Sequence, residues 1–338
     1  MQNKNNSKTK SRSTTQRTML WIVLILYTNL LNANNVDIQS FKLENNYLTL
    51  RITNYGATIQ ELWMKDKNGI QQNLVYGFKN PMDYKTSTKY LGSCIGRHAG
   101  RLSSPLVLDG KVLELQNTNK NVQLHGGKEG FNRKIWDVIS LDSNSIALSY
   151  ISPSGEEGYP GTLKIRAEYR LKKSQLTIKY TATTDEMTVI NLTNHSHFNL
   201  SGSTLPLAKQ FLMINADNTL ETTKELMPTG RFIPVKSGPY DFKSLKKIGE
   251  QKFDTVFALN PGGTCLTYYA EDSGIQMKIS TNQHGMVVFT PSTLNTICFE
   301  TQNFPDAPKF EHFPPSILRP GELYEHNTVY TFNIIKSK

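Results

Sequence analysis

Cysteine and charged residues are scarce in this chain. Of its 338 residues, three are cysteine and 20% are charged. Three scattered cysteines exclude a disulfide-stapled mini-scaffold and a zinc–cysteine cluster, so we expect Cys94, Cys265 and Cys298 to be unpaired core residues. The 38% hydrophobic and 10% aromatic content excludes a disordered chain. The length is sufficient for one large core or two modest ones.

Acidic residues are absent from residues 1–35, which carry five basic residues. The apolar run 19–27 follows the basic part, and the small residue Ala33 comes after it. This order is typical of a secretory signal peptide, and the run is shorter than the roughly 20 residues of a membrane-spanning helix. We therefore expect a leader over 1–35, and a single domain over 36–338 that is secreted or lies in the secretory-pathway lumen. The alternatives are a buried helix and an uncleaved anchor.

The formal net charge of +10 divides between the leader and the domain. Five of these charges lie in the leader, and the rest are spread over about 300 residues without a basic stripe. The sequence therefore disfavours a nucleic-acid partner. We also expect no membrane contact once the leader is cleaved, and a monomer or a weak dimer.

Helical periodicity is scarce, whereas alternation of apolar and polar residues is common from Val36 onward. Residues 163–171 and 176–182 alternate on either side of a short polar break, which predicts a hairpin with one buried and one wet face. The pattern predicts an all-β fold, most simply one large antiparallel β-sandwich. Residues 241–251 are the best candidate for a short helix.

Hydrogen-bonding residues gather in the segment 188–200. If the segment is a strand, Asn191, Thr193, His195 and His197 share one face, which suits a polyhydroxylated ligand, although a solvated face explains the pattern equally well. His195 and His197 could also bind a metal, but a third ligand at a suitable spacing is not evident, so we expect no metal.

The same segment contains three glycosylation sequons. They begin at Asn191, Asn194 and Asn199. Because they overlap the candidate site strand, we expect them to be buried and mostly unmodified despite export.

Two further regions offer candidate site residues. His125 precedes two glycines, which allow a tight turn or a close approach of the backbone to a ligand. Glu300 stands among apolar neighbours at the end of a strand-like run. Desolvation there would disfavour its charged form, which suits a general base, and the alternative is a surface acid.

Short motifs in a fixed order carry a resemblance to a known family. They lie at residues 54–59, 95–102, 124–127, 152–161, 191–196, 228–230, 300–308 and 317–322. In these motifs the chain resembles the aldose 1-epimerases (galactose mutarotases), over about residues 45–335. The resemblance implies a large antiparallel β-sandwich of the galactose mutarotase type. It also implies interconversion of the α and β anomers of free aldohexoses such as glucose and galactose, without a cofactor.

The resemblance also assigns roles to individual residues. Glu300 matches the family's general base and His195 its general acid. Arg101, His125 and Asp254 match positions that bind the sugar. The implied reaction opens the sugar ring by acid–base catalysis and closes it again.

Several positions depart from the family's pattern. Gly100 stands where an asparagine is usual, Val287 replaces a glutamine, and Thr255-Val256 replaces a His-Asn pair. His197 occupies a position where Tyr or Phe is common. These departures motivate an alternative function, a secreted sugar-binding homologue with weak or no catalysis. A relative acting on phosphorylated sugars would need a further basic cluster, and a glycosidase would need a second carboxylate.

Overall fold

The computed structural model describes residues 1–2, 37–202 and 206–336. The predicted leader lies outside these residues apart from its first two positions, so the leader and the domain boundary stay predictions. Residues 38–338 cluster as one compact unit. Within the described part of the chain, no helix has the length and apolar character needed to cross a membrane.

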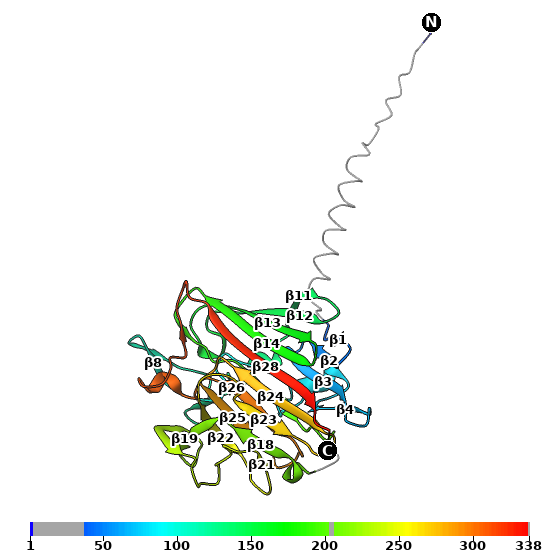
Figure 1. Ribbon diagram of the computed structural model, residues 1–338. Coiled ribbons are helices and arrows are strands. Elements are labelled where there is room, and N and C mark those ends of the chain that lie inside the picture. The colour runs from blue at the N-terminus through cyan, green and yellow to red at the C-terminus, as the bar shows by residue number, and fades with distance from the viewer. Residues whose placement is uncertain (3–36, 203–205, 337–338) are drawn as a thin grey trace. The chain divides into compact units, whose positions relative to one another are not determined.

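A nine-stranded antiparallel sheet forms one layer of this unit (Figure 1). Across the sheet the strands are β11 (Asp137–Leu141), β12 (Ser145–Ser152), β13 (Leu163–Lys172), β14 (Gln175–Thr184), β28 (Tyr324–Ile334), β24 (Ile275–Thr281), β23 (Leu266–Tyr269), β18 (Phe211–Ile214) and β21 (Lys246–Lys247). Side chains in β13 alternate between buried and exposed along most of its length. The predicted hairpin is confirmed, because β13 and β14 pair directly and are joined by a short turn.

A seven-stranded antiparallel sheet forms the second layer. In order it contains β20 (Pro228–Pro234), β19 (Ala216–Thr222), β22 (Asp254–Leu259), β25 (Gly285–Phe289), β26 (Ile297–Gln302), β17 (His197–Phe198) and β5 (Val75–Tyr76). Aromatic rings join the two layers: Phe198 lies 5.7 Å from Tyr330, and Phe299 lies 5.3 Å from Tyr268, measured between ring centroids. The all-β antiparallel sandwich is therefore confirmed.

Among the described residues, the remaining strands form one four-stranded sheet and four two-stranded pairs. A four-stranded sheet contains β1 (Ser40–Glu44), β2 (Leu48–Thr53), β3 (Thr58–Lys65) and β4 (Gln71–Asn73). Two-stranded pairs join β7 (Arg101–Ser103) to β10 (Val122–Leu124), β8 (Leu106–Leu108) to β9 (Lys111–Leu113), β6 (Cys94–Ile95) to β16 (Thr193–Asn194), and β15 (Thr188–Val189) to β27 (Ile317–Leu318). Short 3₁₀ helices lie at Pro81–Lys85, Phe131–Arg133, Glu156–Gly158, Leu207–Lys209 and Ala307–Lys309.

The helix predicted over residues 241–251 is wrong. Lys246–Lys247 instead forms β21, which pairs with Phe211 and Leu212 at the edge of the nine-stranded sheet. The buried residues of the segment, Phe242 and Ile248, stand six positions apart, which does not match the helical period. The conformation of residues 241–251 is therefore decided by the pairing of β21 with the sheet edge and by the turns on either side of that strand.

The three cysteines and the three sequon asparagines are all buried. All three cysteines are buried and free, as expected. The sequon residues Asn191, Asn194 and Asn199 are at most 5% exposed, so their predicted burial is confirmed. Whether they are modified stays a prediction.

Arg97 holds a loop against the sheet from a fully buried position. Its guanidinium donates to the side chains of Ser152 and Thr188 and to the carbonyls of four residues between Ser152 and Gly161, at 2.8–3.1 Å. Burial lowers the pKa of Arg97 to about 10, so the side chain stays charged at neutral pH. This arginine therefore satisfies a loop backbone that would otherwise be buried without partners.

We predict that Arg97→Met lowers the free energy of unfolding by about 3–5 kcal/mol, because it leaves several buried acceptors without donors. Urea denaturation followed by circular dichroism measures this loss. Arg51→Met is the matched control: Arg51 is partly exposed and pairs with Glu61 at 3.3 Å, so about 1 kcal/mol or less is expected. Equal effects of the two substitutions would contradict the role given to Arg97.

Candidate active site

A cavity of about 370 Å³ lies on the face of the seven-stranded sheet that points away from the main core. Strand register decides which residues reach it. Val287 pairs with Glu300 and with Val256 across the sheet, and all three line the cavity. Their neighbours Val288 and Phe299 point into the core instead. The alternation of the strands thus divides each one between core and site.

All five residues predicted for the site line this cavity. They are Arg101, His125, His195, Asp254 and Glu300. Arg101 begins β7, His125 follows β10, Asp254 begins β22 and Glu300 lies within β26. Residues about 200 positions apart in the sequence are therefore brought to one cavity by the sandwich.

Glu300 and His195 form a buried pair at the centre of the site. Oε1 of Glu300 lies 3.4 Å from Nε2 of His195, and their side chains are 2% and 5% exposed. The second carboxylate oxygen of Glu300 has no hydrogen-bond partner among the described residues. The pair therefore offers one oxygen and one ring nitrogen in contact, and a free oxygen for a ligand.

Burial disfavours the charged form of both groups. It raises the pKa of Glu300 to about 8, an effect that the carboxylate of Asp254 reinforces and the charge of Arg101 opposes. Burial also lowers the pKa of His195 to about 4. Between these values the pair holds one proton, and transfer across the 3.4 Å contact moves that proton from one partner to the other.

Backbone and amide hydrogen bonds fix the position of His195. It follows β16, and its N–H donates to the carbonyl of Ser93 at 3.0 Å. The side chain of Asn194 donates to the carbonyl of Gly92 at 2.8 Å and accepts from the hydroxyl of Ser196. The Asn-His-Ser motif thus serves as a rigid support that holds one catalytic candidate.

The segment 188–200 is not one continuous strand, so the predicted polar face is only partly correct. Asn191 donates to the carbonyls of Ala99 and Asn303, and Thr193 donates to that of Thr301. These two residues hold the segment in place, whereas His195 and His197 reach the cavity. The segment divides into β15, β16 and β17, and this interrupts the alternation expected of one strand.

His125 is held as a neutral hydrogen-bond donor. The N–H of Gly100 donates to Nδ1 of His125 at 3.2 Å, which leaves the ring proton on Nε2. Burial and the nearby charge of protonated His195 keep the pKa of His125 well below its usual value. The glycine after it serves packing, since a Cβ at Gly126 would lie 1.8 Å from the carbonyl oxygen of Gly96.

Arg101 and Asp254 are the more open members of the site. The side chain of Arg101 is half-buried, and its positive charge acts on His125, Asp254 and Glu300. Asp254 lines the cavity, where desolvation raises its pKa, an effect that the charge of Arg101 opposes. A cation and a carboxylate are thereby free to bind hydroxyl groups at the cavity wall.

The departures from the family pattern fall largely on the cavity lining. Gly100, Val256, Val287 and His197 line it, whereas Thr255 is buried. Gly100 adopts a left-handed backbone (φ +76°), and a Cβ there would lie 2.9 Å from the ring of Pro305. Valines at 256 and 287 make one wall apolar, which suits the C–H face of a ligand more than its hydroxyls.

Sequence reasoning missed two aromatic residues of the site. Tyr90 stacks on His195 with 5.8 Å between ring centroids and meets His125 edge-on at 4.8 Å. Phe289 meets His195 edge-on at 6.1 Å. Tyr90 lies in a loop, so the alternation of apolar and polar residues gave no signal for it. Phe289 lies in a strand, where an aromatic residue is common and does not by itself indicate a site.

Among the described residues, two sets of side chains in or beside the cavity could hold a metal ion. The ligand atoms of His125, His195 and Glu300 lie within 4.8 Å of one another, as do those of His195, His197 and Cys298. Cys298 is the third ligand that the sequence did not reveal, because it lies about 100 positions from the histidines. The expectation that catalysis needs no metal stays a prediction.

Known proteins resemble this chain over nearly its whole length. The sequence profile of the family "Aldose 1-epimerase" matches residues 39–331. Galactose mutarotase of Sus scrofa is 34% identical over 324 residues, which cover 88% of this chain and 94% of that protein. Aldose 1-epimerase of Escherichia coli K12 is 27% identical over 318 residues, covering 84% and 92%.

A solved structure supports the same assignment. The GalM/aldose epimerase homologue from C. elegans superposes with a TM-score of 0.85 and 30% identity, covering 89% of this chain and all of that one. Profile, relatives and fold agree with the motifs and the cavity described above. The chain belongs to the aldose 1-epimerase family.

Proposed function

We propose that this chain is an aldose 1-epimerase that interconverts the α and β anomers of free aldohexoses. The observation that carries the proposal is the buried pair of Glu300 and His195, which holds one transferable proton at the centre of the cavity. A galactose mutarotase and an aldose 1-epimerase among its relatives support free aldoses, galactose among them, as substrates.

The reaction needs one base and one acid at the same time. The base removes the proton of the C1 hydroxyl, and the acid protonates the ring oxygen, so that the C1–O5 bond breaks. Rotation about C1–C2 and closure with the roles exchanged give the other anomer. Glu300 serves as the base and His195, once protonated, as the acid, and each such group contributes about 10²–10⁴-fold to the rate.

A bound sugar changes the surroundings that favour the uncharged pair. Its hydroxyls replace lost water as hydrogen-bond partners of the carboxylate, and Arg101 also favours the charged form of Glu300. The proton then passes to His195, which leaves Glu300 ready to accept the proton from C1. Nε2–H of His125, Arg101 and Asp254 bind the remaining hydroxyls and hold the ring between base and acid.

The alternative, a sugar-binding homologue without catalysis, rests on the changes at Gly100 and Val287. Those changes alter the wall of the cavity, whereas the contact between Glu300 and His195 is kept. A binding protein has no need of a buried carboxyl that shares a proton with a histidine, and burial of such a group is costly. The site therefore favours catalysis.

We further propose that the chain enters the secretory pathway. The basic residues and apolar run at the start of the sequence support this proposal. Oligomeric state is a separate matter, and a monomer or weak dimer stays our expectation.

We predict that Glu300→Gln lowers the catalysed rate of mutarotation by about 10²–10⁴-fold, because an amide cannot accept the C1 proton. Polarimetry of freshly dissolved α-glucose or α-galactose measures the rate. Glu311→Gln makes the same change at an exposed position outside the cavity and should leave the rate unchanged. A wild-type rate in Glu300→Gln with normal circular dichroism would reject the role of Glu300.

We also predict a bell-shaped dependence of kcat/KM on pH. Activity falls below about pH 4, where His195 and Glu300 both carry a proton and no base remains, and above about pH 8, where both have lost it and no acid remains. Initial rates over a pH series that brackets both values, corrected for uncatalysed mutarotation, give the profile. Activity that keeps rising above the upper value would contradict a shared proton.

For secretion, we expect the exported protein to begin near residue 36, because the predicted leader ends at residue 35 with the small residue Ala33 close to the cleavage point. N-terminal sequencing of protein collected from the medium of expressing cells determines the start. A chain that still begins at Met1 would reject cleavage.

A further inference from the structure

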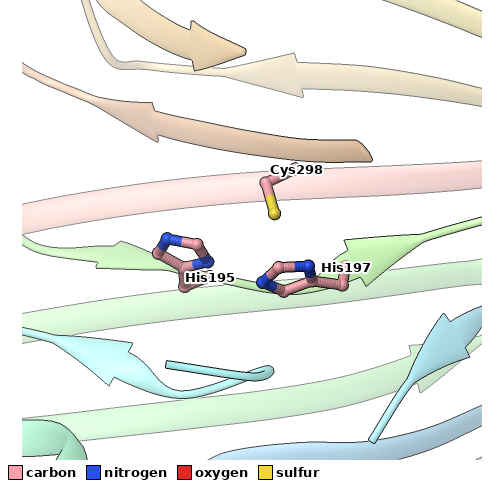
Figure 2. Close-up of side chains that lie close together, drawn as sticks. All are labelled: His195, His197 and Cys298. Carbon is pink, nitrogen blue, oxygen red and sulfur yellow. The ribbon is translucent and has the colours of Figure 1, made fainter. Parts of the chain in front are cut away.

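Two ring nitrogens and one sulfur meet beside the catalytic pair. His197 lies in β17 directly opposite Cys298 of β26, and His195 lies two residues earlier in the chain. Directly paired residues on one sheet face bring their side chains together. Figure 2 shows the sulfur of Cys298 pointing toward the gap between the two imidazole rings. The ligand atoms of the three residues lie within 4.8 Å of one another.

The nitrogens that face this gap are the ones without partners. Nε2 of His195 contacts Glu300, and Nδ1 of His197 lies 3.0 Å from the hydroxyl of Thr296. Nδ1 of His195 and Nε2 of His197 are buried with no hydrogen-bond partner among the described residues. A buried polar atom without a partner is costly, so two of them aimed into one gap point to a site for a ligand that binds both nitrogens.

The donor set selects the chemical class of that ligand. Two imidazoles and one thiolate suit zinc, whereas magnesium and calcium prefer oxygen ligands. Tetrahedral zinc would need these atoms about 3.3–3.6 Å apart, so side-chain shifts of about 1 Å or less close the site. His195 and His197 line the cavity, which gives an ion a path inward and leaves its fourth position to water or a sugar hydroxyl.

We propose that His195, His197 and Cys298 form a zinc site through which Zn²⁺ reversibly inhibits this protein. Binding releases the thiol proton to solvent and forms bonds from zinc to Sγ and to the two unpartnered nitrogens. His195 then keeps its one remaining ring proton on Nε2, facing Glu300. It can no longer accept a proton there or become imidazolium, so it is lost as a catalytic acid.

The binding part of this inference stands on geometry alone, and the inhibition rests on the proposed function. Removing one ligand should weaken zinc binding by at least about tenfold, because even partners outside the coordination sphere are worth about 10–100-fold in affinity.

Direct binding is measured first, on the full chain, without reference to activity. Co²⁺ is added as a spectroscopic substitute for Zn²⁺, and a thiolate-to-cobalt charge-transfer band is expected with one ion per chain. Zn²⁺ should abolish the band by displacement. Cys298→Ser and His197→Phe should both remove it, whereas Cys265→Ser, which alters a buried thiol in the other layer, should retain it. A band that survives Cys298→Ser would overturn the site.

Inhibition is then measured by polarimetry with Zn²⁺ and, as a control, Mg²⁺. Zn²⁺ should inhibit and a chelator should restore the rate, while Mg²⁺ has no effect. In Cys298→Ser the basal rate should stay unchanged and the inhibitory zinc concentration should rise at least about tenfold. Unchanged zinc sensitivity in this variant would overturn the proposal. If mutarotation is absent even without metal, the proposed function fails while the cobalt band still tests the site.

Discussion

The burial of a carboxyl beside an imidazole is the constraint on which the site depends. Glu300 and His195 touch at 3.4 Å in a place where neither charged form is favoured, so they share one proton rather than forming a stable ion pair. A reaction that needs an acid and a base together is served by such a pair. The rigid strand β26 and the anchored Asn-His-Ser motif keep the two groups in place.

Because backbone contacts hold the catalytic pair in place, the side chains of the cavity wall can vary while the acid–base pair is kept. Gly100, Val256 and Val287 alter the side chains of the cavity wall, while the backbone of Val287 still pairs with that of Glu300. The supports are instead backbone hydrogen bonds at Ser93 and the strand pairing of β25 with β26. Changes to the lining therefore act on which sugar binds, and changes to the supports would act on catalysis.

The histidine at 197 gives the site a feature of its own. Its unpartnered nitrogen faces that of His195, with Cys298 directly across the strand pair. An arrangement that places a second imidazole beside a catalytic one also creates a donor set for a soft metal. The catalytic residue would then be shared between two uses that exclude each other.

The sequence by itself determined the fold class, because successive side chains of a β-strand point to opposite faces whichever strand lies beside it. The residues of β13 and β14 show this alternation directly. Motifs identified Glu300, His195, Arg101, His125 and Asp254 as candidates. Only the tertiary structure decided that these residues share one cavity, that Asn191 and Thr193 serve as supports, and that residues 241–251 are not helical. Contacts such as that of Cys298 with His197 join positions about 100 residues apart, and strand register, which no local pattern specifies, decides them.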